Sequence, residues 1–226
     1  MKVFFVGAGP GDPELLTIKA ERLLRNCRVC IYAGSLVSPD VIALLPTDAE
    51  KHDSAALSLE QTTAICRDAQ RRGLDVARLH SGDPAIFGAI GEQMSALDRL
   101  GIDYEVVPGV SAFQASAAAL RVELTAPEVA QTIILTRMGN RTPTPPEQEL
   151  SRLAQTRATL CIFLSVNKLD EIAAMLATHY GMECPAAVVY HASWPDQRII
   201  FGKLADIAAR TAAADIQKTA LIVVGH

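Results

Sequence analysis

The sequence contains no apolar run that approaches the roughly 20 residues needed to cross a bilayer. Its first residues, MKVFFVGAGPGD, hold one lysine and a short apolar run that leads directly into glycines, whereas a secretory signal needs a longer apolar region. The formal net charge of −4 provides no basic excess for binding nucleic acid or an anionic membrane. We therefore expect a soluble, cytoplasmic protein with neither nucleic acid nor membrane as a partner.

Cysteines are few, and their spacing does not indicate a disulfide framework. The chain has five, and an odd number without regular spacing argues against a disulfide scaffold. Cys27 and Cys30 have the CxxC spacing, but the second ligand pair that a zinc site requires is not evident. A redox pair stays open as an alternative to two ordinary semi-buried residues. The second alternative is favoured because Cys30 lies within the apolar run Val29–Tyr32.

Common catalytic signatures are also missing. The sequence has no GxSxG elbow and no Walker lysine motif, and His80 precedes a loop instead of pairing with a serine elbow. His52 beside Asp53 fits a solvated strand end better than a catalytic pair. The remaining histidines are scattered without metal-ligand spacing, so we expect no metal site.

Short apolar segments alternate with amphipathic ones, which predicts an α/β protein. Half of the 226 residues are apolar, enough to bury the core of one large domain or two small ones. The periodicity lapses between Arg121 and Gln131, so we expect one domain over residues 1–121 and a second over 122–226. The strand at 198–202 directly follows another strand, which predicts a partly antiparallel second sheet. The expected strands are 2–6, 28–32, 76–79, 104–107, 132–136, 159–164, 186–190, 198–202 and 220–224.

Helix boundaries are indicated by capping residues. Asp12 followed by Pro13 predicts a helix start, with Asp12 as its N-cap. Ser58 and Gln61 match a capping box, and Gly73 is the expected end of the helix that follows. Further helices are expected over 111–120, 147–155, 168–179 and 204–213.

The glycine-rich loop of residues 7–12, GAGPGD, lies between a predicted strand and a predicted helix, which is the context of a dinucleotide-binding loop. Asp12 occupies the position of the third glycine, and Pro10 lacks a backbone donor for a pyrophosphate. The second strand also ends without the acidic residue that would hold a ribose. An NAD site and a tight turn without a ligand both remain as alternatives here.

Two more loops follow predicted strands, SGDPAIFG over residues 81–88 and PGVSA over residues 108–112. Ligands of open α/β sheets bind beyond the carboxyl ends of strands, where both loops are expected. Gly82 would allow a ligand to approach the backbone, and Asp83 offers it a carboxylate. Ile86 and Phe87 could form an apolar wall, although an ordinary Asp-Pro turn is the alternative.

Arg137 and Arg141 flank a loop after another predicted strand. Two cations at this position could meet an anionic substrate. Exposed arginines without a ligand are the alternative.

In their order, the three glycine loops resemble the tetrapyrrole methyltransferase family. The similar segments are VGAGPGDPELLT (6–17), SGDPAIFG (81–88) and VPGVSA (107–112). Members are two-domain α/β enzymes, usually homodimers, that bind S-adenosylmethionine in the cleft between the domains. The resemblance therefore implies two tandem α/β domains, S-adenosylmethionine as the cofactor, an acidic tetrapyrrole as the substrate, and a homodimer.

Four more segments narrow the resemblance to the branch that methylates precorrin-4 or cobalt-precorrin-4 at ring carbon 11 in cobalamin biosynthesis. They are YAGSLV (32–37), LTRMGNRTPTPPEQELSRLA (135–154), IFLSV (162–166) and VVYHASWPDQRII (188–200). The resemblance also leads us to expect a short tail beyond His226. Other precorrin or uroporphyrinogen methyltransferases, and the diphthine-forming enzymes that modify a protein, remain as alternatives.

The resemblance also implies a set of site residues. Asp83 would lie near the polar end of the cofactor, and Leu164 would pack on the adenosine. Leu164 and Ala192 stand where some members have Met and Gly, which keeps these positions apolar and small. Arg137 and Arg141 become candidates for binding the substrate carboxylates, and no general base is identified. The implied cofactor-binding residues are Pro10, Gly82, Asp83, Ile86, Ser111, Ala112, Leu164, Ala192 and Ala220.

Overall fold

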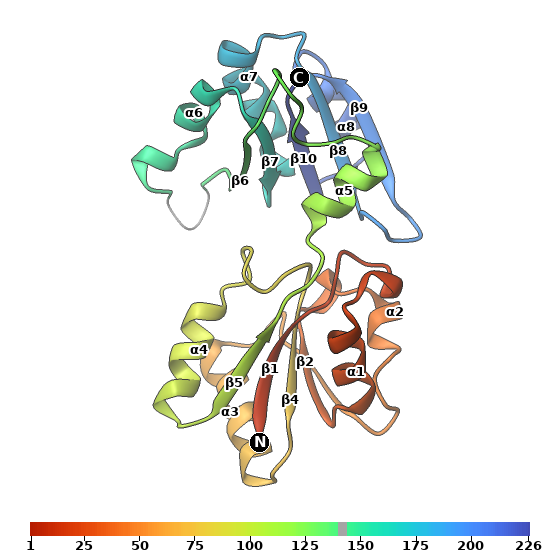
Figure 1. Cartoon of the computed structure of the whole chain (residues 1–226), viewed down its shortest axis with the longest axis vertical. Helices are drawn as coiled ribbons and strands as arrows, with labels where there is room; N and C mark the ends of the chain where they lie inside the picture. The colour runs from red at the N-terminus through yellow and green to blue at the C-terminus, as the bar shows by residue number, and fades with distance from the viewer. Residues whose placement is uncertain (140–143) are drawn as a thin grey trace. The chain divides into compact units, whose positions relative to one another are not determined.

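The apolar run at the start of the chain forms strand β1 (Lys2–Gly7) in the computed structural model, which describes residues 1–139 and 144–226. β1 lies in a five-stranded parallel sheet of order β3-β2-β4-β1-β5 (Figure 1). Because β1, β4 and β5 are adjacent, the loops that follow them meet at one edge. The other strands are β2 (Val29–Tyr32), β3 (Glu50–Asp53), β4 (Val76–His80) and β5 (Asp103–Val107).

Helices cover both faces of this first sheet, as parallel sheets require. On one face, α1 (Ile18–Asn26) and α2 (Pro39–Ile42) pack on strand residues that include Val6 and Leu79. On the other, α3 (Leu59–Arg71) and α4 (Ile90–Arg99) pack on Phe5 and its neighbours. The central strands therefore bury both faces, which explains why β1 is apolar at nearly every position.

The prediction that a helix starts at Asp12 was wrong, because α1 starts at Ile18. Asp12 caps only the short 3-10 turn η1 (Pro13–Leu15), and Leu16 then becomes extended, with ψ 147°. A second cap follows at once, because the hydroxyl of Thr17 accepts from the backbone N–H of Ala20 at 3.1 Å and starts α1.

The capping box at Ser58 is confirmed, with both reciprocal hydrogen bonds present at the start of α3. Gly73 follows this helix with φ +69°, as a glycine that ends a helix commonly does. By contrast, α4 was not expected, and β3 was expected only as a strand end at His52 and Asp53. β3 (EKHD) is a short, largely exposed edge strand without apolar alternation, and among the described strands it pairs with β2 alone.

The second sheet is mixed, with order β6-β7-β10-β8-β9. β10 runs antiparallel to both β7 and β8, and β8 is antiparallel to β9, which confirms the predicted partly antiparallel arrangement. The strands are β6 (Ile133–Arg137), β7 (Thr159–Phe163), β8 (Pro185–Tyr190), β9 (Arg198–Lys203) and β10 (Ala220–Val224).

One face of the second sheet is covered by α7 (Leu169–Tyr180), α8 (Ile207–Ala213) and the short α6 (Leu150–Leu153). The single helix expected over 147–155 is wrong. Glu149 is extended, with ψ 142°, so this segment divides into a 3-10 turn, α6 and a second 3-10 turn. The remaining 3-10 turns are η2 (Gly34–Leu36), η3 (Pro146–Gln148), η4 (Ala154–Thr156) and η5 (Val166–Lys168).

The chain forms two compact units, Met1–Ala112 and Phe113–His226. From the sequence we expected the boundary after Arg121, with the helix before it in the first domain. In the structure, α5 (Ala112–Leu120) belongs mainly to the second unit. Its residues Ala115 and Leu120 pack against the second sheet on the face opposite α7. The loss of periodicity from which we inferred the domain boundary follows α5, whereas the two units divide at the start of α5.

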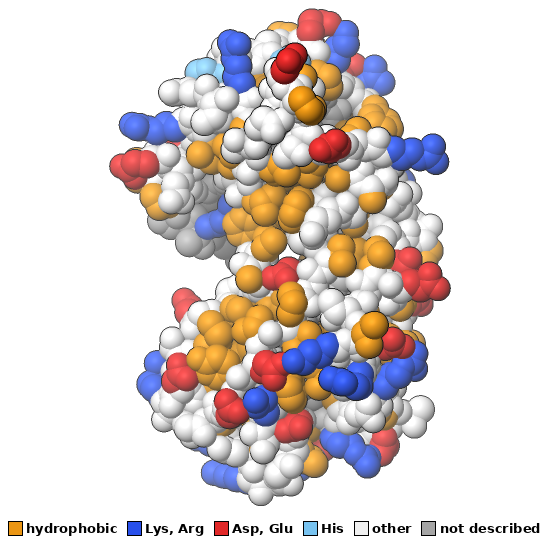
Figure 2. Space-filling model, in the orientation of Figure 1, with side chains coloured by type: hydrophobic (Ala, Val, Ile, Leu, Met, Phe, Trp, Pro, Cys, Tyr) orange, Lys and Arg blue, Asp and Glu red, His pale blue; other side chains and the backbone are white. Residues whose placement is uncertain are grey.

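The surface carries charges of both signs. On the face drawn in Figure 2, acidic and basic side chains are interspersed over both units, in agreement with the small net charge. None of the helices in the described part of the chain has the length and apolarity that crossing a bilayer requires.

Candidate cofactor site

Two of the glycine loops are joined by backbone hydrogen bonds at the carboxyl edge of the first sheet. The N–H of Ala8 donates to the carbonyl of His80 at 2.8 Å. Gly9 and Gly82 form an antiparallel bridge, with N···O distances of 3.3 and 2.8 Å. The loop after β1 and the loop after β4 therefore hold each other in place.

The third loop packs on these two through glycine backbones. A Cβ on Gly7 would lie 2.6 Å from the Cα of Gly109 and 2.7 Å from the carbonyl oxygen of Gly82. A Cβ on Gly109 would lie only 2.3 Å from that same oxygen. Gly7 and Gly109 were not among the predicted site residues. Their positions directly after strands were the available signal, but the close contact depends on the strand order.

Asp83 connects the loop after β4 to the loop after β5. One carboxylate oxygen accepts from the backbone N–H of Gly109 at 2.9 Å, and the other accepts from that of Ala85 at 2.7 Å. Both bonds are charge-assisted, and Asp83 is half-buried. The carboxylate therefore positions these loops, and each oxygen keeps a second lone pair with which to accept from a ligand.

The other predicted residues of the first unit lie around the same edge. A Cβ on Gly82 would lie 3.4 Å from the Cα of Ser111 and 3.6 Å from the backbone nitrogen of Ala112, so these three residues are neighbours. Ile86 donates its backbone N–H to the carbonyl of Asp83 at 3.2 Å. Pro10 directly follows the glycine that forms the bridge. The predicted residues of the first unit thus gather where three strands end.

The predicted residues of the second unit also share one sheet edge. Ala220 begins β10 and pairs with Tyr190, the last residue of β8, two positions before Ala192. Because β10 is antiparallel to β7, its start also lies beside the end of β7, where Leu164 follows. Leu164 is 66% exposed and has φ +54°, a strained conformation for a leucine.

Arg137 ends β6 next to Phe163, at this same edge of the second sheet. It is half-buried. Arg141, the other predicted substrate-binding arginine, lies outside the described residues.

Comparison with known proteins decides what family these loops belong to. The family model of the tetrapyrrole (corrin/porphyrin) methylases matches residues 2–208. The chain belongs to this family. The family predicted from the three glycine loops is therefore confirmed, and so is the two-domain α/β fold class.

Individual relatives within the methylase family match over the whole chain. The precorrin-4 C(11)-methyltransferase of Pseudomonas aeruginosa is 52% identical over 226 residues, covering 100% of this chain and 90% of the relative. The structure of a cobalt precorrin-4 methyltransferase matches with a TM-score of 0.96 and 41% identity, covering 99% and 94% of the two chains. The uroporphyrin-III C-methyl transferase of Thermus thermophilus, in complex with S-adenyl homocysteine, matches with a TM-score of 0.83 and 33% identity, covering 100% and 92%.

His80 is buried behind the glycine loops of this methylase. Its Nε2 atom has no hydrogen-bond partner among the described residues. Burial, together with the nearby cation of Arg78, lowers the pKa of His80 to about 3. The imidazole is therefore neutral at physiological pH and serves as a core residue at the end of β4.

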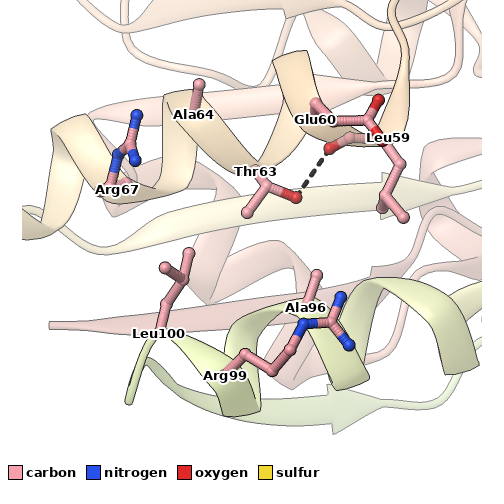
Figure 3. Close-up of a pocket in the computed structure, with 8 residues that line it drawn as sticks. All are labelled: Leu59, Glu60, Thr63, Ala64, Arg67, Ala96, Arg99 and Leu100. Atoms are coloured by element: carbon pink, nitrogen blue, oxygen red, sulfur yellow. Dashed lines mark hydrogen bonds between the residues drawn. The ribbon is translucent and has the colours of Figure 1, made fainter.

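A groove of about 310 Å³ lies between α3 and α4 (Figure 3). Apolar residues such as Leu59 and Leu100 line it, and the hydroxyl of Thr63 donates to the carbonyl of Leu59 at 2.7 Å. It contains no predicted site residue, and it lies between helices instead of at strand ends. The groove is therefore separate from the candidate site.

The cysteines lie away from the strand-end loops that form the site. All five are buried free thiols, and Cys27 and Cys30 both belong to the core between α1 and the first sheet. A hydrogen bond with Cys27, together with burial, raises the pKa of Cys30. Across residues 1–139 and 144–226, no cluster of three or more His, Cys, Asp or Glu side chains is arranged to bind a metal.

Proposed function

We propose that this methylase transfers the methyl group of S-adenosylmethionine to carbon 11 of precorrin-4 or cobalt-precorrin-4, a step of cobalamin biosynthesis. The observation that carries the proposal is the 52% identity to a precorrin-4 C(11)-methyltransferase along the entire chain. The TM-score of 0.96 with a cobalt precorrin-4 methyltransferase supports it independently.

In the first unit, we propose that Gly82, Asp83, Ser111 and Ala112 bind the cofactor, with Pro10 and Ile86 beside them. The absence of a side chain at Gly82 supports this, because backbone groups of the loop stay open to a ligand. The bonds from Asp83 to Gly109 and Ala85 hold this loop in one conformation. A preorganised loop loses less entropy when it binds a ligand.

In the second unit, we propose Leu164, Ala192 and Ala220 as cofactor-binding residues. A leucine that is 66% exposed in a left-handed conformation costs energy, and such strain is concentrated at functional sites. An adenosine ring packed on Leu164 would cover this apolar surface. Ala192 and Ala220 are small, so they leave room at the same edge.

Bound S-adenosylmethionine supplies a sulfonium methyl that is already strongly electrophilic, so no side-chain nucleophile is required. The task of the protein is to hold the acceptor carbon about 3–3.5 Å from the methyl group and in line with the sulfur. The loops joined through Gly7, Gly82 and Gly109 provide a rigid surface for this purpose. Apolar residues such as Leu164 would keep water away from the reacting atoms.

The substrate carries many carboxylates, which require local cations on a protein of net charge −4. We propose Arg137, at the end of β6, as one of these cations, and Arg141 as another on the basis of the sequence. The position of Arg137 at the same sheet edge as Leu164 supports its role.

A homodimer and a cytoplasmic location complete the proposal. The first rests on the family resemblance, and the second on the sequence features from which we expected it. Sedimentation equilibrium of the purified chain tests the first directly. A mass of twice 24.2 kDa is expected, whereas a single-chain mass at micromolar concentration would remove the dimer from the account.

A uroporphyrinogen methyltransferase is the second candidate, favoured by the TM-score of 0.83 with the Thermus thermophilus enzyme. The test is kcat/KM measured with precorrin-4, cobalt-precorrin-4 and uroporphyrinogen III under identical conditions. We expect one of the two precorrin-4 forms to be preferred by at least about 100-fold, near 2.7 kcal/mol in transition-state binding. A preference for uroporphyrinogen III would replace the proposal by this second candidate.

A further inference from the structure

An imidazole–carboxylate pair lies at the end of β8, and it has no role in the function proposed above. The Nδ1 atom of His191 is 2.9 and 3.0 Å from the two carboxylate oxygens of Asp196. The imidazole is stacked between two aromatic rings. Its centroid is 3.8 Å from that of Tyr190 and 4.4 Å from that of Trp194, with interplanar angles of 16° and 26°.

The loop that carries this pair is held by its own backbone and side chains. His191 and Ser193 have φ values of +47° and +68°, which turn the chain sharply after β8. The N–H of Ser193 donates to the side-chain oxygen of Gln197 at 2.7 Å, and that of Trp194 donates to the carbonyl of His191 at 2.9 Å. Two left-handed non-glycine residues in one short loop are unusual, and strain of this kind is typical of functional sites.

The pair lies at the edge of the second sheet that carries the candidate site residues. The N–H of His191 donates to the carbonyl of Thr219 at 3.2 Å, directly before Ala220. Ala192 is its neighbour in the chain, and Leu164 follows the strand on the other side of β10. An acid–base group is therefore fixed beside three proposed cofactor-binding positions.

The surroundings of His191 determine which nitrogen is available. The Asp196 carboxylate accepts a hydrogen bond from Nδ1–H, so a neutral imidazole has its lone pair on Nε2. This bond holds the pKa of Asp196 below its usual range, which keeps the carboxylate charged. Two ionisable groups of neighbouring strands face the stack, the Tyr190 phenol of β8 and the Arg198 guanidinium of β9, which lies 4.6 Å from the Tyr190 ring centroid. Arg198 also donates to the carbonyl of Ala214 at 2.7 Å.

We propose that His191, oriented by Asp196, accepts the proton that the macrocycle loses when it is methylated. The inference rests on the proposed function. A ring carbon bonded to a ring nitrogen uses a π electron pair to form the new bond to the methyl carbon. The carbon–sulfur bond breaks, and its electron pair stays on sulfur as a neutral thioether. The metal-free macrocycle then carries one added positive charge, and transfer of its N–H proton to Nε2 of His191 restores the charge that it had before methylation. The imidazolium formed is stabilised by Asp196 and later releases the proton to water.

The test distinguishes the base function of the imidazole nitrogens from the packing of the aromatic ring. His191→Phe keeps an aromatic ring between Tyr190 and Trp194 but removes the base, and the exposed Asp196 stays solvated without its partner. We expect kcat to fall by about 100-fold, the lower end of the usual range for general-base catalysis. The acid limb of the wild-type kcat–pH profile should disappear, and the Kd for S-adenosylhomocysteine should stay within twofold. His179→Phe is the matched control, since His179 lies near the end of α7, and it should leave both kcat and the pH profile unchanged.

Asp196→Asn is the second variant, and it tests the positioning role without altering the stack. It should lower kcat at least about tenfold and change the acid limb, because an amide no longer fixes Nδ1 as a donor. The outcomes are decisive even if His191→Phe fails to fold. Wild-type kcat and an unchanged acid limb in either folded variant would overturn the assignment. If the wild-type enzyme were inactive with both precorrin-4 forms, the proposed function would be rejected instead. Failure of the proposed function can therefore be distinguished from failure of the assignment of His191.

Discussion

Replacing Gly109 by alanine is the sharpest perturbation of the candidate cofactor site. The new Cβ would lie 2.3 Å from the carbonyl oxygen of Gly82 and 2.9 Å from the Cα of Gly7. Both neighbours are backbone atoms, one in the loop after β4 and one in the last residue of β1, so no side-chain rotation can relieve the contact. The loop after β5 must therefore move away from the other two loops.

The cost can be worked out from the contacts that this movement breaks. Overpacking of a tightly packed position typically costs about 1–3 kcal/mol. The hydrogen bond from Gly109 N–H to Asp83 is 2.9 Å long, and losing such a bond to a charged group costs about 1.5–3 kcal/mol more. We expect the first unit to be destabilised by about 3 kcal/mol, and the Kd for S-adenosylhomocysteine to rise at least about tenfold.

The assay must report on the first unit alone. Trp194 is the only tryptophan and belongs to the second unit, so its fluorescence serves as an internal control. Amide hydrogen exchange in β1, β4 and β5 measures the stability of the first unit, and calorimetry measures the affinity for S-adenosylhomocysteine. The matched variant is Gly91→Ala in α4, where a Cβ meets nothing within 4 Å. It should leave affinity unchanged and raise stability by up to about 1 kcal/mol. If Gly109→Ala had the protection and affinity of the wild type, the argument from glycine packing would be refuted.

Three further predictions concern single side chains. Asp83→Asn should lower both the protection of the loop amides against hydrogen exchange and the affinity for S-adenosylhomocysteine, each by about 1.5–3 kcal/mol. The reason is that the amide nitrogen of Asn cannot accept from the backbone N–H of Gly109 or Ala85. Wild-type values in hydrogen exchange and calorimetry would contradict this. The pKa of His80 is lowered to about 3, so the unfolded chain binds a proton below pH ~6.5 that the folded chain does not. Unfolding free energy should therefore decrease by up to about 1.4 kcal/mol per pH unit as the pH falls from 6.5, and His80→Phe should remove this slope in denaturant titrations; equal slopes in both proteins would refute the assignment. Arg137→Ala should weaken macrocycle binding by about 1.5–3 kcal/mol and flatten its salt dependence, without altering cofactor affinity; an unchanged salt slope would remove Arg137 from the site.

Much of the fold could be predicted because its signals are local. The capping box of Ser58 and Gln61 acts within one turn, and the sequence was sufficient to find it. Asp12 and Pro13 form an equally clear signal, yet they start only a 3-10 turn, because Thr17 supplies the cap from which α1 continues. Neighbouring caps compete, and sequence patterns alone do not rank them.

Elements that depend on their neighbours were harder to predict. β3 is formed by polar residues because β2 offers a free edge, and the EKHD segment has no apolar alternation that would indicate the whole strand. Likewise, the helical residues expected over 147–155 are interrupted at Glu149, whose extended backbone no local pattern indicates. Such outcomes are determined by tertiary packing and outweigh intrinsic propensity.

The candidate site shows the same division. The glycine loops could be located because they follow apolar strands, and the family resemblance supplied the residue roles. The bond between Asp83 and Gly109 could not be foreseen, since it joins residues of two loops that only the strand order brings together. The stacking of His191 between Tyr190 and Trp194 also depends on two left-handed residues, whose backbone conformations the sequence does not indicate.

The central claim is methyl transfer to carbon 11, and the product can be observed directly. The measurement is incubation of the purified chain with S-adenosylmethionine carrying a ¹³C-labelled methyl group, together with precorrin-4 or cobalt-precorrin-4, followed by NMR of the isolated product. The account predicts one labelled methyl group per macrocycle, bonded to C11, in at least one of the two substrate forms. A label on a different ring carbon, or no transfer to either form by protein that binds S-adenosylhomocysteine, would contradict it.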